Sequence, residues 1–315
     1  MGCPRLPPRR GYVTTSCPCL RYPPAWSRSS TTSPRAGAGD SVAMRGSAAV
    51  PSELFDDAEF ERFTRGIRKL WNIDLSSYGQ RQLHRRLRGM MSRGHAETLD
   101  EFLVYLSNNP AESELLKDRF TINVSEFFRD AHLFAKLEKM LGPGGECAGA
   151  RKVWSAGCSY GAEPYTLAMI LSDTGRGSDC QLYATDIDQG VLERARAGIF
   201  TERDIRNVSE QRRQRYFKAN DDGTLTISSQ LRPRVLFAKL DLLAPGGKQP
   251  MNCDLILCRN VIIYFTDEAK AGVQQMLVRS LRPGGVLLIG ATERVPDASD
   301  LGLQSMGPFF YKKVA

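Results

Sequence analysis

The chain has 315 residues, with 43 lysines and arginines against 35 aspartates and glutamates, which gives a formal charge of +8. Apolar residues make up 42% and charged residues 25%, a globular composition that excludes a disordered, collagenous or coiled-coil protein. No apolar run approaches the roughly 18 residues of a membrane span. The net positive charge favours an acidic partner, and nucleic acid, a membrane surface and an acidic protein are the three candidates.

The charge is concentrated at the N-terminus. Residues 1–43 hold six arginines, no lysine and one acid, Asp40, so +5 of the +8 lies there. The segment shows no periodicity and lacks the apolar region of a secretory signal. Two interpretations stay open: a disordered tail, or upstream sequence translated ahead of a working protein that begins at Met44, which we favour. Residues 1–50 are therefore expected to form an extension outside the folded domains.

Residues 51–140 have helical periodicity throughout. Apolar side chains recur three or four positions apart, as in Phe60, Phe63 and Ile67, and again in Leu83 and Leu87. No strand-like alternation interrupts this pattern. The segment is predicted to be a small all-helical domain.

The chain then changes to strands and helices in alternation. After a glycine-rich linker at 141–145, strands are expected at 152–156, 181–185, 235–240, 254–258, 286–290 and 308–312. Alternating units of this kind predict an α/β fold, with a parallel sheet covered by helices on both faces, over residues 141–315. An insertion at about 200–234, with a basic helix at 210–216 and a strand at 224–227, is predicted to be a β-hairpin subdomain. The five cysteines of this half show no pairing pattern and are expected to be reduced.

Two strand ends carry candidate ligand-binding residues. Gly157 and Gly161 bracket a tight turn after the first strand, where backbone can approach a ligand closely. Asp186 ends the second strand, a position that commonly binds ribose hydroxyls. Together with Glu163 it would flank a nucleoside without a cradle of lysine or arginine, which argues against NAD and ATP and favours S-adenosylmethionine. The alternative is that neither residue binds a ligand, so that Glu163 only caps a helix and Asp186 is a surface residue.

The C-terminal part has the layout of a class I methyltransferase, with L-R-P-G-G-V-L-L-I-G at 281–290 before a final strand. Four further motifs make the resemblance specific. They are T-I-N-V-S-E-F-F-R-D-A-H-L-F at 121–134, V-W-S-A-G-C-S-Y-G-A-E-P-Y-T-L-A at 153–168, A-T-D-I-D at 184–188 and C-R-N-V-I-I-Y-F at 258–265. They resemble, in order, the signatures of the CheR family, the chemotaxis receptor glutamate methyltransferases, over about residues 53–313. The resemblance implies a Rossmann-like S-adenosylmethionine-dependent methyltransferase with a small N-terminal helical domain, located in the cytoplasm.

The resemblance also implies a cofactor pocket for S-adenosylmethionine, drawn from several segments: Asn123, Ser125, Arg129, Gly157, Glu163, Asp186, Asp241, Leu242, Arg259 and Asn260. The family usually has threonine where this chain has Ser125, so the hydroxyl is kept. Asp241 stands where the family often has asparagine, which replaces an amide with a carboxylate at the adenine contact.

The implied reaction needs no general base. A glutamate side chain has a reference pKa of about 4.3, so it is already a carboxylate at neutral pH and can attack the sulfonium methyl group directly, releasing S-adenosylhomocysteine. Catalysis is expected to depend on positioning and desolvation, without a metal. Arg129 and Tyr264 are the candidates for orienting the carboxylate. The alternatives are a structural ion pair of Arg129 with Asp130 or another acid, and a core role for Tyr264.

A basic stripe is the candidate docking surface, and the alternative is a charged outer face that is only solvated. On a helix, Arg81, Arg85 and Arg88 share the face opposite Leu83 and Leu87. In the CheR family the corresponding helix meets the acidic helices of receptors, so the expected partner is the cytoplasmic helical domain of a chemoreceptor. No nucleic acid is expected, and membrane contact is expected only through the receptor.

Two other functions stay open for the chain as a whole. One is a methyltransferase that acts on nucleic acids or small molecules, although methylation of base amino groups usually needs a D/N-P-P-Y-like motif where this chain has R-N-V-I-I-Y. The other is a non-catalytic module that binds the cofactor.

Overall fold

The computed structural model describes residues 55–71, 73–92, 96–120, 125–176 and 179–314. The N-terminal extension predicted over residues 1–50 lies outside these ranges. No helix of the described ranges is long and apolar enough to cross a membrane. The five cysteines from Cys147 to Cys258 are all buried, and each carries a free thiol.

Helices α1 to α4 form the N-terminal part of the described chain, in agreement with the predicted all-helical segment. They are α1 Asp57–Trp71, α2 Gln80–Met91, α3 Leu99–Asn108 and α4 Pro110–Phe120, with a 3₁₀ turn at Leu75–Ser77. The apolar positions that define the helical period, among them Phe63, Ile67 and Leu87, form one buried cluster. Helix α3 begins at a capping box, in which the Thr98 hydroxyl accepts from the Glu101 amide and the Glu101 carboxylate accepts from the Thr98 amide.

The fifth helix packs with the sheet and not with α1–α4. Helix α5, Ala131–Leu141, contributes Phe134 and Leu137 to the large core under the sheet, and Phe127 and Phe128 before it join the same core. The sequence placed the boundary between the two domains at residues 140 and 141. That boundary stays a prediction, and the packing of α5 favours an earlier one, before Phe127.

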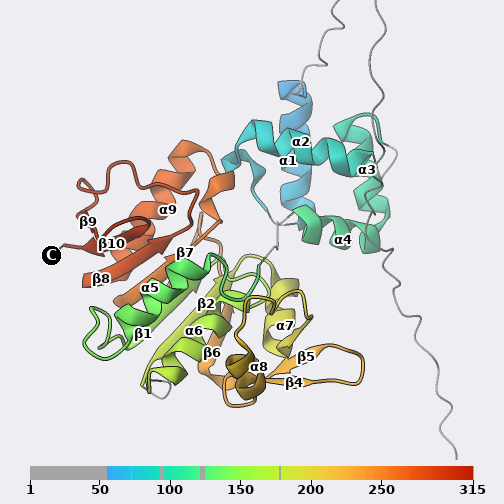
Figure 1. Cartoon of the computed structure of the whole chain (residues 1–315). Helices are drawn as coiled ribbons and strands as arrows, with labels where there is room; N and C mark the ends of the chain where they lie inside the picture. Colours follow the sequence, from blue (N-terminus) through green and yellow to red (C-terminus); the bar gives the residue numbers. More distant parts are fainter. Residues whose placement is uncertain (1–54, 72, 93–95, 121–124, 177–178, 315) are drawn as a thin grey trace, which may run out of the picture. The chain divides into compact units, whose positions relative to one another are not determined.

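A seven-stranded sheet forms the centre of the C-terminal part, in the order β6-β2-β1-β7-β8-β10-β9 (Figure 1). Its strands are β1 Lys152–Ala156, β2 Gln181–Asp186, β6 Val235–Lys239, β7 Cys253–Cys258, β8 Leu281–Ile289, β9 Leu303–Ser305 and β10 Phe310–Lys313. The first five strands in this order are parallel, while β10 runs antiparallel to β8 and β9 antiparallel to β10. The order and direction confirm the Rossmann-like fold.

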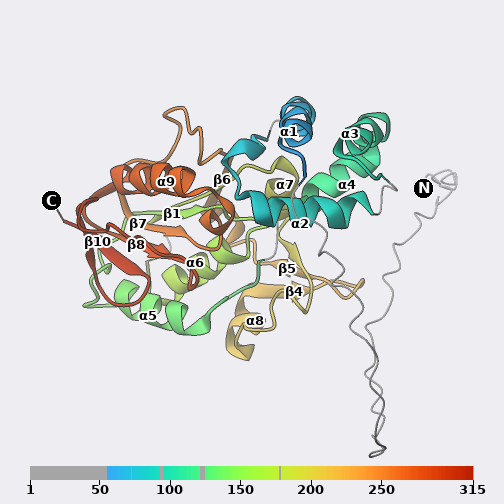
Figure 2. The ribbon, with the colours of Figure 1, turned by 90° about the horizontal axis from the view of Figure 1, so that it is seen from above.

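Helices cover both faces of the sheet. Helices α5 and α6 (Ala162–Asp173) lie on one face and α9 (Asp267–Ser280) on the other (Figure 2). Thr266 caps α9, because its side chain accepts from the Ala269 amide. Helix α7, Gln189–Ala197, adds Val191 and Leu192 to the core on the α6 face.

Two details of the sheet differ from the prediction. Strand β8 starts at Leu281, five residues before the predicted start at residue 286. Leu281 pairs with Cys253 of β7, and the register then shifts so that Val286 pairs with Leu255. The Pro-Gly-Gly sequence at 283–285 resembles a turn, but it lies inside this irregular strand. Strand β9 was missed since it has only three residues, two of them exposed polar side chains.

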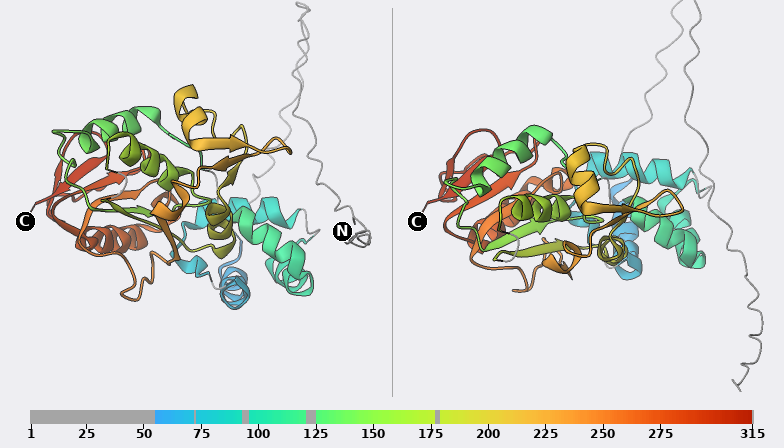
Figure 3. Two further views of the ribbon diagram at one scale, coloured as in Figure 1. Left: turned by 90° about the horizontal axis from the view of Figure 1, so that it is seen from below. Right: turned by 60° about the horizontal axis from the view of Figure 1, so that its bottom comes forward.

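The insertion forms the predicted hairpin with an additional strand. Strands β4 (Phe217–Ala219) and β5 (Leu225–Ile227) pair antiparallel, and β3 (Ile199–Phe200) pairs with the other edge of β5. Helix α8, Glu210–Tyr216, has the predicted bounds and lies beside this small sheet, in yellow in Figure 3.

Candidate active site

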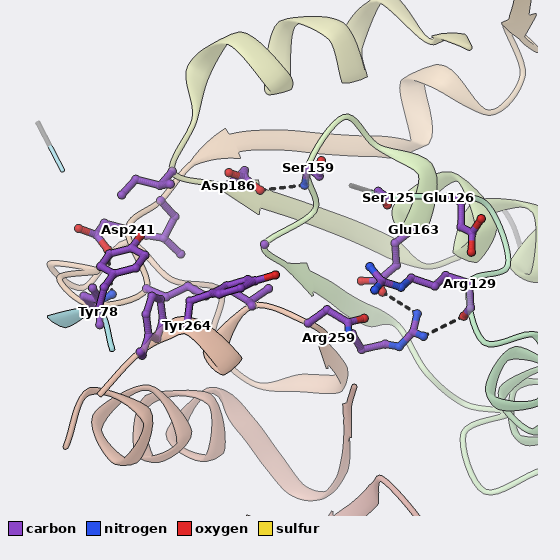
Figure 4. A pocket seen from close by; sticks show the side chains of 18 of the residues that line it. Tyr78, Ser125, Glu126, Arg129, Ser159, Glu163, Asp186, Asp241, Arg259 and Tyr264 are labelled. Atoms are coloured by element: carbon purple, nitrogen blue, oxygen red, sulfur yellow. Dashed lines mark hydrogen bonds and ion pairs between the residues drawn. The ribbon is translucent and has the colours of Figure 1, made fainter. Parts of the chain in front are cut away.

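One pocket lies at the ends of the parallel strands and brings the predicted residues together (Figure 4). This is the edge at which doubly wound sheets bind their ligands. Its lining includes every described cofactor-binding or catalytic candidate: Ser125, Arg129, Gly157, Glu163, Asp186, Asp241, Leu242, Arg259, Asn260 and Tyr264. Asn123 lies outside the described residues. The docking candidates Arg85 and Arg88 are exposed on α2, and the side chain of Arg81 lies outside the described part of the chain.

The glycine turn after β1 brings backbone to the pocket. Gly157 has a φ of +75°, and a Cβ atom there would lie 2.4 Å from Cγ2 of Val261. Only glycine fits this turn without strain, because both the backbone conformation and the space exclude a side chain. The turn continues to Ser159, whose amide donates to Asp186 at 2.8 Å.

Asp186 is held at the end of β2 by backbone hydrogen bonds. One carboxylate oxygen accepts from the Ser159 amide and the other from the Asp188 amide, at 2.8 and 3.1 Å. Burial nevertheless raises the pKa of the Asp186 carboxyl from 3.8 to about 6. The carboxylate is thus ionised at neutral pH but titrates just below it, as is common for groups in functional pockets.

Arg259 ties two walls of the pocket together. Its side chain is 2% exposed, and it contacts Glu163 from α6 at 3.1 Å and Asp130 at 2.7 Å. The same guanidinium donates to the backbone oxygen of Arg129 at 2.8 Å. The neighbours of Arg129, Phe128 and Asp130, both have left-handed backbone conformations, with φ of 52° and 59°. Arg259 therefore holds a strained loop that presents Arg129 to the pocket.

The sequence predicted that no lysine or arginine lies near Glu163 and Asp186, and the structure shows that this prediction is wrong. Arg86, Arg129 and Arg259 all line the pocket, and Arg259 pairs with Glu163 directly. Sequence spacing could not reveal this pair because 96 residues separate its members. The pocket is therefore mixed in charge, and the choice of cofactor depends on the family and on the unpaired polar atoms described below.

Glu293 is a buried residue of the site that sequence reasoning missed. It is 3% exposed, and its carboxylate accepts from the amides of Gly290, Asn260, Val261 and Ile262 at 2.7 to 3.1 Å. Burial raises the pKa of this carboxyl against the effect of these four donors. The glutamate fixes the start of the segment that leads to Tyr264. Its only signal in the sequence is an acid shortly after the buried strand β8.

Two more missed residues come from the helical part. Tyr78 and Arg86 line the pocket, and the Arg86 guanidinium lies 5.0 Å from the centre of the Tyr264 ring. Burial raises the pKa of the Tyr264 phenol, so its hydroxyl stays protonated at neutral pH. Nothing in the helical periodicity distinguishes Tyr78, since it lies between helices.

Some buried polar atoms of the pocket have no hydrogen-bond partner among the described residues. They are Oγ of Ser159, Oδ1 of Asn260 and Nε of Arg259. Buried polar atoms without a protein partner need an explanation, and a bound polar ligand is one. Asn260 and Ser159 also have left-handed backbones, with φ of 60° and 50°. The two unpaired oxygens share the pocket with the carboxylates of Asp186 and Glu163, and such acceptors fit a ligand that carries hydroxyl and ammonium groups, as S-adenosylmethionine does.

Comparison with known proteins agrees with this site. Residues 58–121 match the family described as "CheR methyltransferase, all-alpha domain", and residues 123–307 match "CheR methyltransferase, SAM binding domain". The chain is 35% identical over 259 residues to the "Chemotaxis protein methyltransferase" of Listeria monocytogenes, covering 82% of this chain and 98% of that protein. It is 34% identical to the protein of the same name from Escherichia coli, covering 75% and 84%. It is 33% identical to "Chemotaxis protein methyltransferase 1" of Pseudomonas aeruginosa, covering 78% and 93%.

Proposed function

The chain belongs to the CheR methyltransferase family, and from this premise we propose that it methylates glutamate side chains of chemoreceptors, using S-adenosylmethionine. The observation that carries the proposal is the pocket at the ends of β1, β2 and β7. The pocket holds carboxylates that can bind an adenosyl group and buried oxygens that have no partner among the described residues. It also holds Arg129 and Tyr264, which can donate hydrogen bonds to a substrate carboxylate. The proposal places the enzyme in the cytoplasm, where it would reach the receptor's helical domain.

The cofactor would bind along the pocket in an extended form. Asp186 would accept hydrogen bonds from the ribose hydroxyls, and Asp241 with Leu242 would contact the adenine. Glu163 and the unpaired amide oxygen of Asn260 would face the cationic methionyl end, with Ser125 beside them. Asn123 and Gly157 would complete the pocket, Gly157 by letting the backbone approach the ligand.

The transfer itself is a single displacement. A carboxylate oxygen of the substrate glutamate attacks the sulfonium methyl carbon, the new C–O bond forms as the S–C bond breaks, and S-adenosylhomocysteine leaves with the electron pair on sulfur. No proton moves, because the glutamate is already ionised. The rate depends on in-line placement of the two reactants in a site that excludes water.

Arg129 and Tyr264 would hold the oxygen that does not attack. Tyr264 suits this role because its phenol stays protonated and can donate, and Arg129 carries a permanent charge. Arg259 would contact the cofactor through Nε, which has no partner among the described residues, and would position Arg129 through its hydrogen bonds to Glu163, Asp130 and the backbone of Arg129. The expectation that no metal takes part stays a prediction.

The exposed arginines of α2 support docking to an acidic receptor helix. Arg85 and Arg88 project from the face opposite the buried Leu83 and Leu87, and Arg81 would extend the stripe by one turn. Attraction between opposite charges would bring the receptor to the pocket and fix its register. The segment 218–226, which holds the short turn between β4 and β5, resembles that of the family members that do not tether a receptor tail.

The test is base-labile methyl transfer. The full chain is incubated with S-adenosylmethionine labelled in the methyl group and with receptor-rich membranes, and base is then added. A glutamate methyl ester releases volatile labelled methanol, and the variant Asp186→Asn should release much less. Label that resists base would indicate an amine or nucleic-acid methyltransferase. No transfer at all, with cofactor binding intact, would indicate a non-catalytic module.

A further inference from the structure

The segment between the 3₁₀ turn and α2 pairs with the segment that carries Tyr264. The Gly79 amide donates to the Tyr264 carbonyl, and the Thr266 amide donates to the Ser77 carbonyl, both at 2.8 Å. Between these bonds, Tyr78 and Phe265 form an antiparallel bridge. Residues 77–79 of the helical part are therefore fixed to the rim of the pocket by main-chain hydrogen bonds, which do not depend on flexible side chains.

This pairing directs the Tyr78 side chain into the pocket. Its ring lies edge-on to Phe265, with 5.2 Å between centroids, and both residues line the cavity. In Figure 4 Tyr78 lies at the end of the pocket that holds Asp241, while Arg129, Glu163 and Arg259 occupy the other end. The chain neighbours of Asp241 that also line the pocket are apolar, namely Leu240, Leu242 and Leu243. An aromatic ring among leucines, with carboxylates nearby, is suited to a flat heterocycle that bears amino and hydroxyl donors.

The ionisation of Tyr78 fits the same role. Burial, followed by the charges of Asp241 and Asp186, raises the pKa of the Tyr78 phenol far above its usual value. A tyrosine phenol with an ordinary pKa of about 10 is already neutral at pH 7, so Tyr78 does not repel the two carboxylates proposed for the adenosyl group. An uncharged ring keeps a face on which a purine can pack.

We infer that Tyr78 binds the adenosine part of the cofactor, so that the helical domain supplies one wall of the cofactor pocket in addition to docking the receptor. The inference rests on the proposed function, since it takes S-adenosylmethionine as the ligand. Packing of a base against an aromatic side chain changes affinity by roughly 5- to 150-fold when the ring is removed. Tyr78 would therefore determine how tightly the cofactor is held without touching the reacting methyl group.

Calorimetric titration of the full chain tests this inference with two probes. S-adenosylhomocysteine carries both ends of the cofactor, and 5′-methylthioadenosine lacks the amino-acid end. Tyr78→Leu should weaken both probes by the same factor, at least about fivefold. Tyr78→Phe, which keeps the ring, should bind both within about twofold of the wild type. Arg129→Ala should weaken only S-adenosylhomocysteine.

Tyr105→Leu is the matched control, because it makes the same change in the helical part at a residue that packs on Phe102 and does not line the pocket. Equal affinities for Tyr78→Leu and Tyr105→Leu would overturn the inference. If Tyr78→Leu does not fold, Tyr78→Trp replaces it, and its added fluorescence should change when 5′-methylthioadenosine binds; no change also overturns the inference. A wild-type chain that binds neither probe would instead refute the proposed function.

Discussion

Arg259 and Glu163 form a buried ion pair, with 3.1 Å between the guanidinium and the carboxylate and side-chain exposures of 2% and 12%. The pair connects the end of β7 to the first turn of α6, and Asp130 joins it at 2.7 Å. Glu163 also accepts from the Ser155 hydroxyl at 2.7 Å. One guanidinium thus serves two carboxylates, and removing it leaves both without their cation.

We expect Arg259→Met to lower the free energy of unfolding by about 3 kcal/mol, because it removes the cation from the largely buried Glu163 and from the partly exposed Asp130. Urea denaturation measures the loss. The control is Arg213→Met, which breaks the more exposed pair with Glu202 and should cost at most about 1 kcal/mol. Equal losses in the two variants would show that the Arg259 network contributes no more to stability than an exposed ion pair.

Glu293→Gln should destabilise the chain and slow methyl transfer together. A glutamine offers one acceptor oxygen in place of two, and its NH₂ group would face amides that now donate to Glu293. Leaving buried N–H groups unpaired costs about 1–3 kcal/mol each, and the segment leading to Tyr264 loses its anchor. Glu268→Gln, in the first turn of α9, should change the free energy of unfolding by under about 1 kcal/mol. Wild-type stability and rate in Glu293→Gln would contradict the anchoring role.

The ion pairs of Arg259 and the hydrogen bonds to Glu293 could not be predicted from the sequence, whereas the strands that carry them could. Runs such as Leu255–Cys258 and Val286–Ile289 identify buried strands, so β7 and β8 end within one residue of the predicted positions. The glycine turn and Asp186 follow from strand-end chemistry. Glu293 and Tyr78 could not be found, because their roles depend on contacts with residues far along the chain. Arg259 was found, but its pairing with Glu163 was not.

Tyr264→Phe should reduce methyl transfer roughly 10- to 100-fold while leaving the Kd for S-adenosylhomocysteine within about twofold. The lost hydroxyl would have donated to the substrate carboxylate, and a hydrogen bond to a charged group contributes about 1.5–3 kcal/mol. Methanol release and calorimetry measure the two quantities. Tyr105→Phe removes a phenolic hydroxyl away from the pocket and should alter neither. A Tyr264→Phe variant with lost cofactor affinity and an unchanged rate would assign Tyr264 to the cofactor.

Cofactor affinity should fall as the pH drops through about 6. The Asp186 carboxyl has a pKa of about 6 in the unliganded pocket, and ribose hydroxyls that donate to its ionised form would lower that pKa on binding. Binding therefore releases a proton below pH 6, and linkage makes the affinity rise with pH across this range. We expect S-adenosylhomocysteine to bind about tenfold more weakly at pH 5 than at pH 7.5.

Asp186→Asn separates this effect from other titrations, because asparagine does not ionise in this range. Its affinity should be weak and nearly independent of pH. If the variant keeps the wild-type pH step, another buried acid causes it, and Glu293, whose pKa is also raised by burial, becomes the candidate. A flat profile in the wild type would contradict an ionised Asp186 as the ribose acceptor.

Reversing two charges on α2 should separate receptor docking from cofactor binding. The double variant Arg85→Glu and Arg88→Glu places acids where the acidic receptor helix is proposed to lie, so methylation should fall at least about tenfold at low ionic strength. Salt screens exposed charges over about 8–10 Å, so the wild-type rate should drop toward that of the variant as salt is added. The Kd for S-adenosylhomocysteine should stay within about twofold of the wild type.

The control is Arg65→Glu with Lys69→Glu, which changes the charge by the same amount on exposed positions of α1. If net charge alone attracts the receptor, the two double variants should lose methylation equally, and the α2 surface would have no special role. Weaker cofactor binding in the α2 variant would instead assign the effect to the pocket, through Arg86 and Tyr264. We expect only the α2 variant to lose methylation, because its arginines share a helix with Arg86, which lines the pocket where the substrate glutamate must arrive.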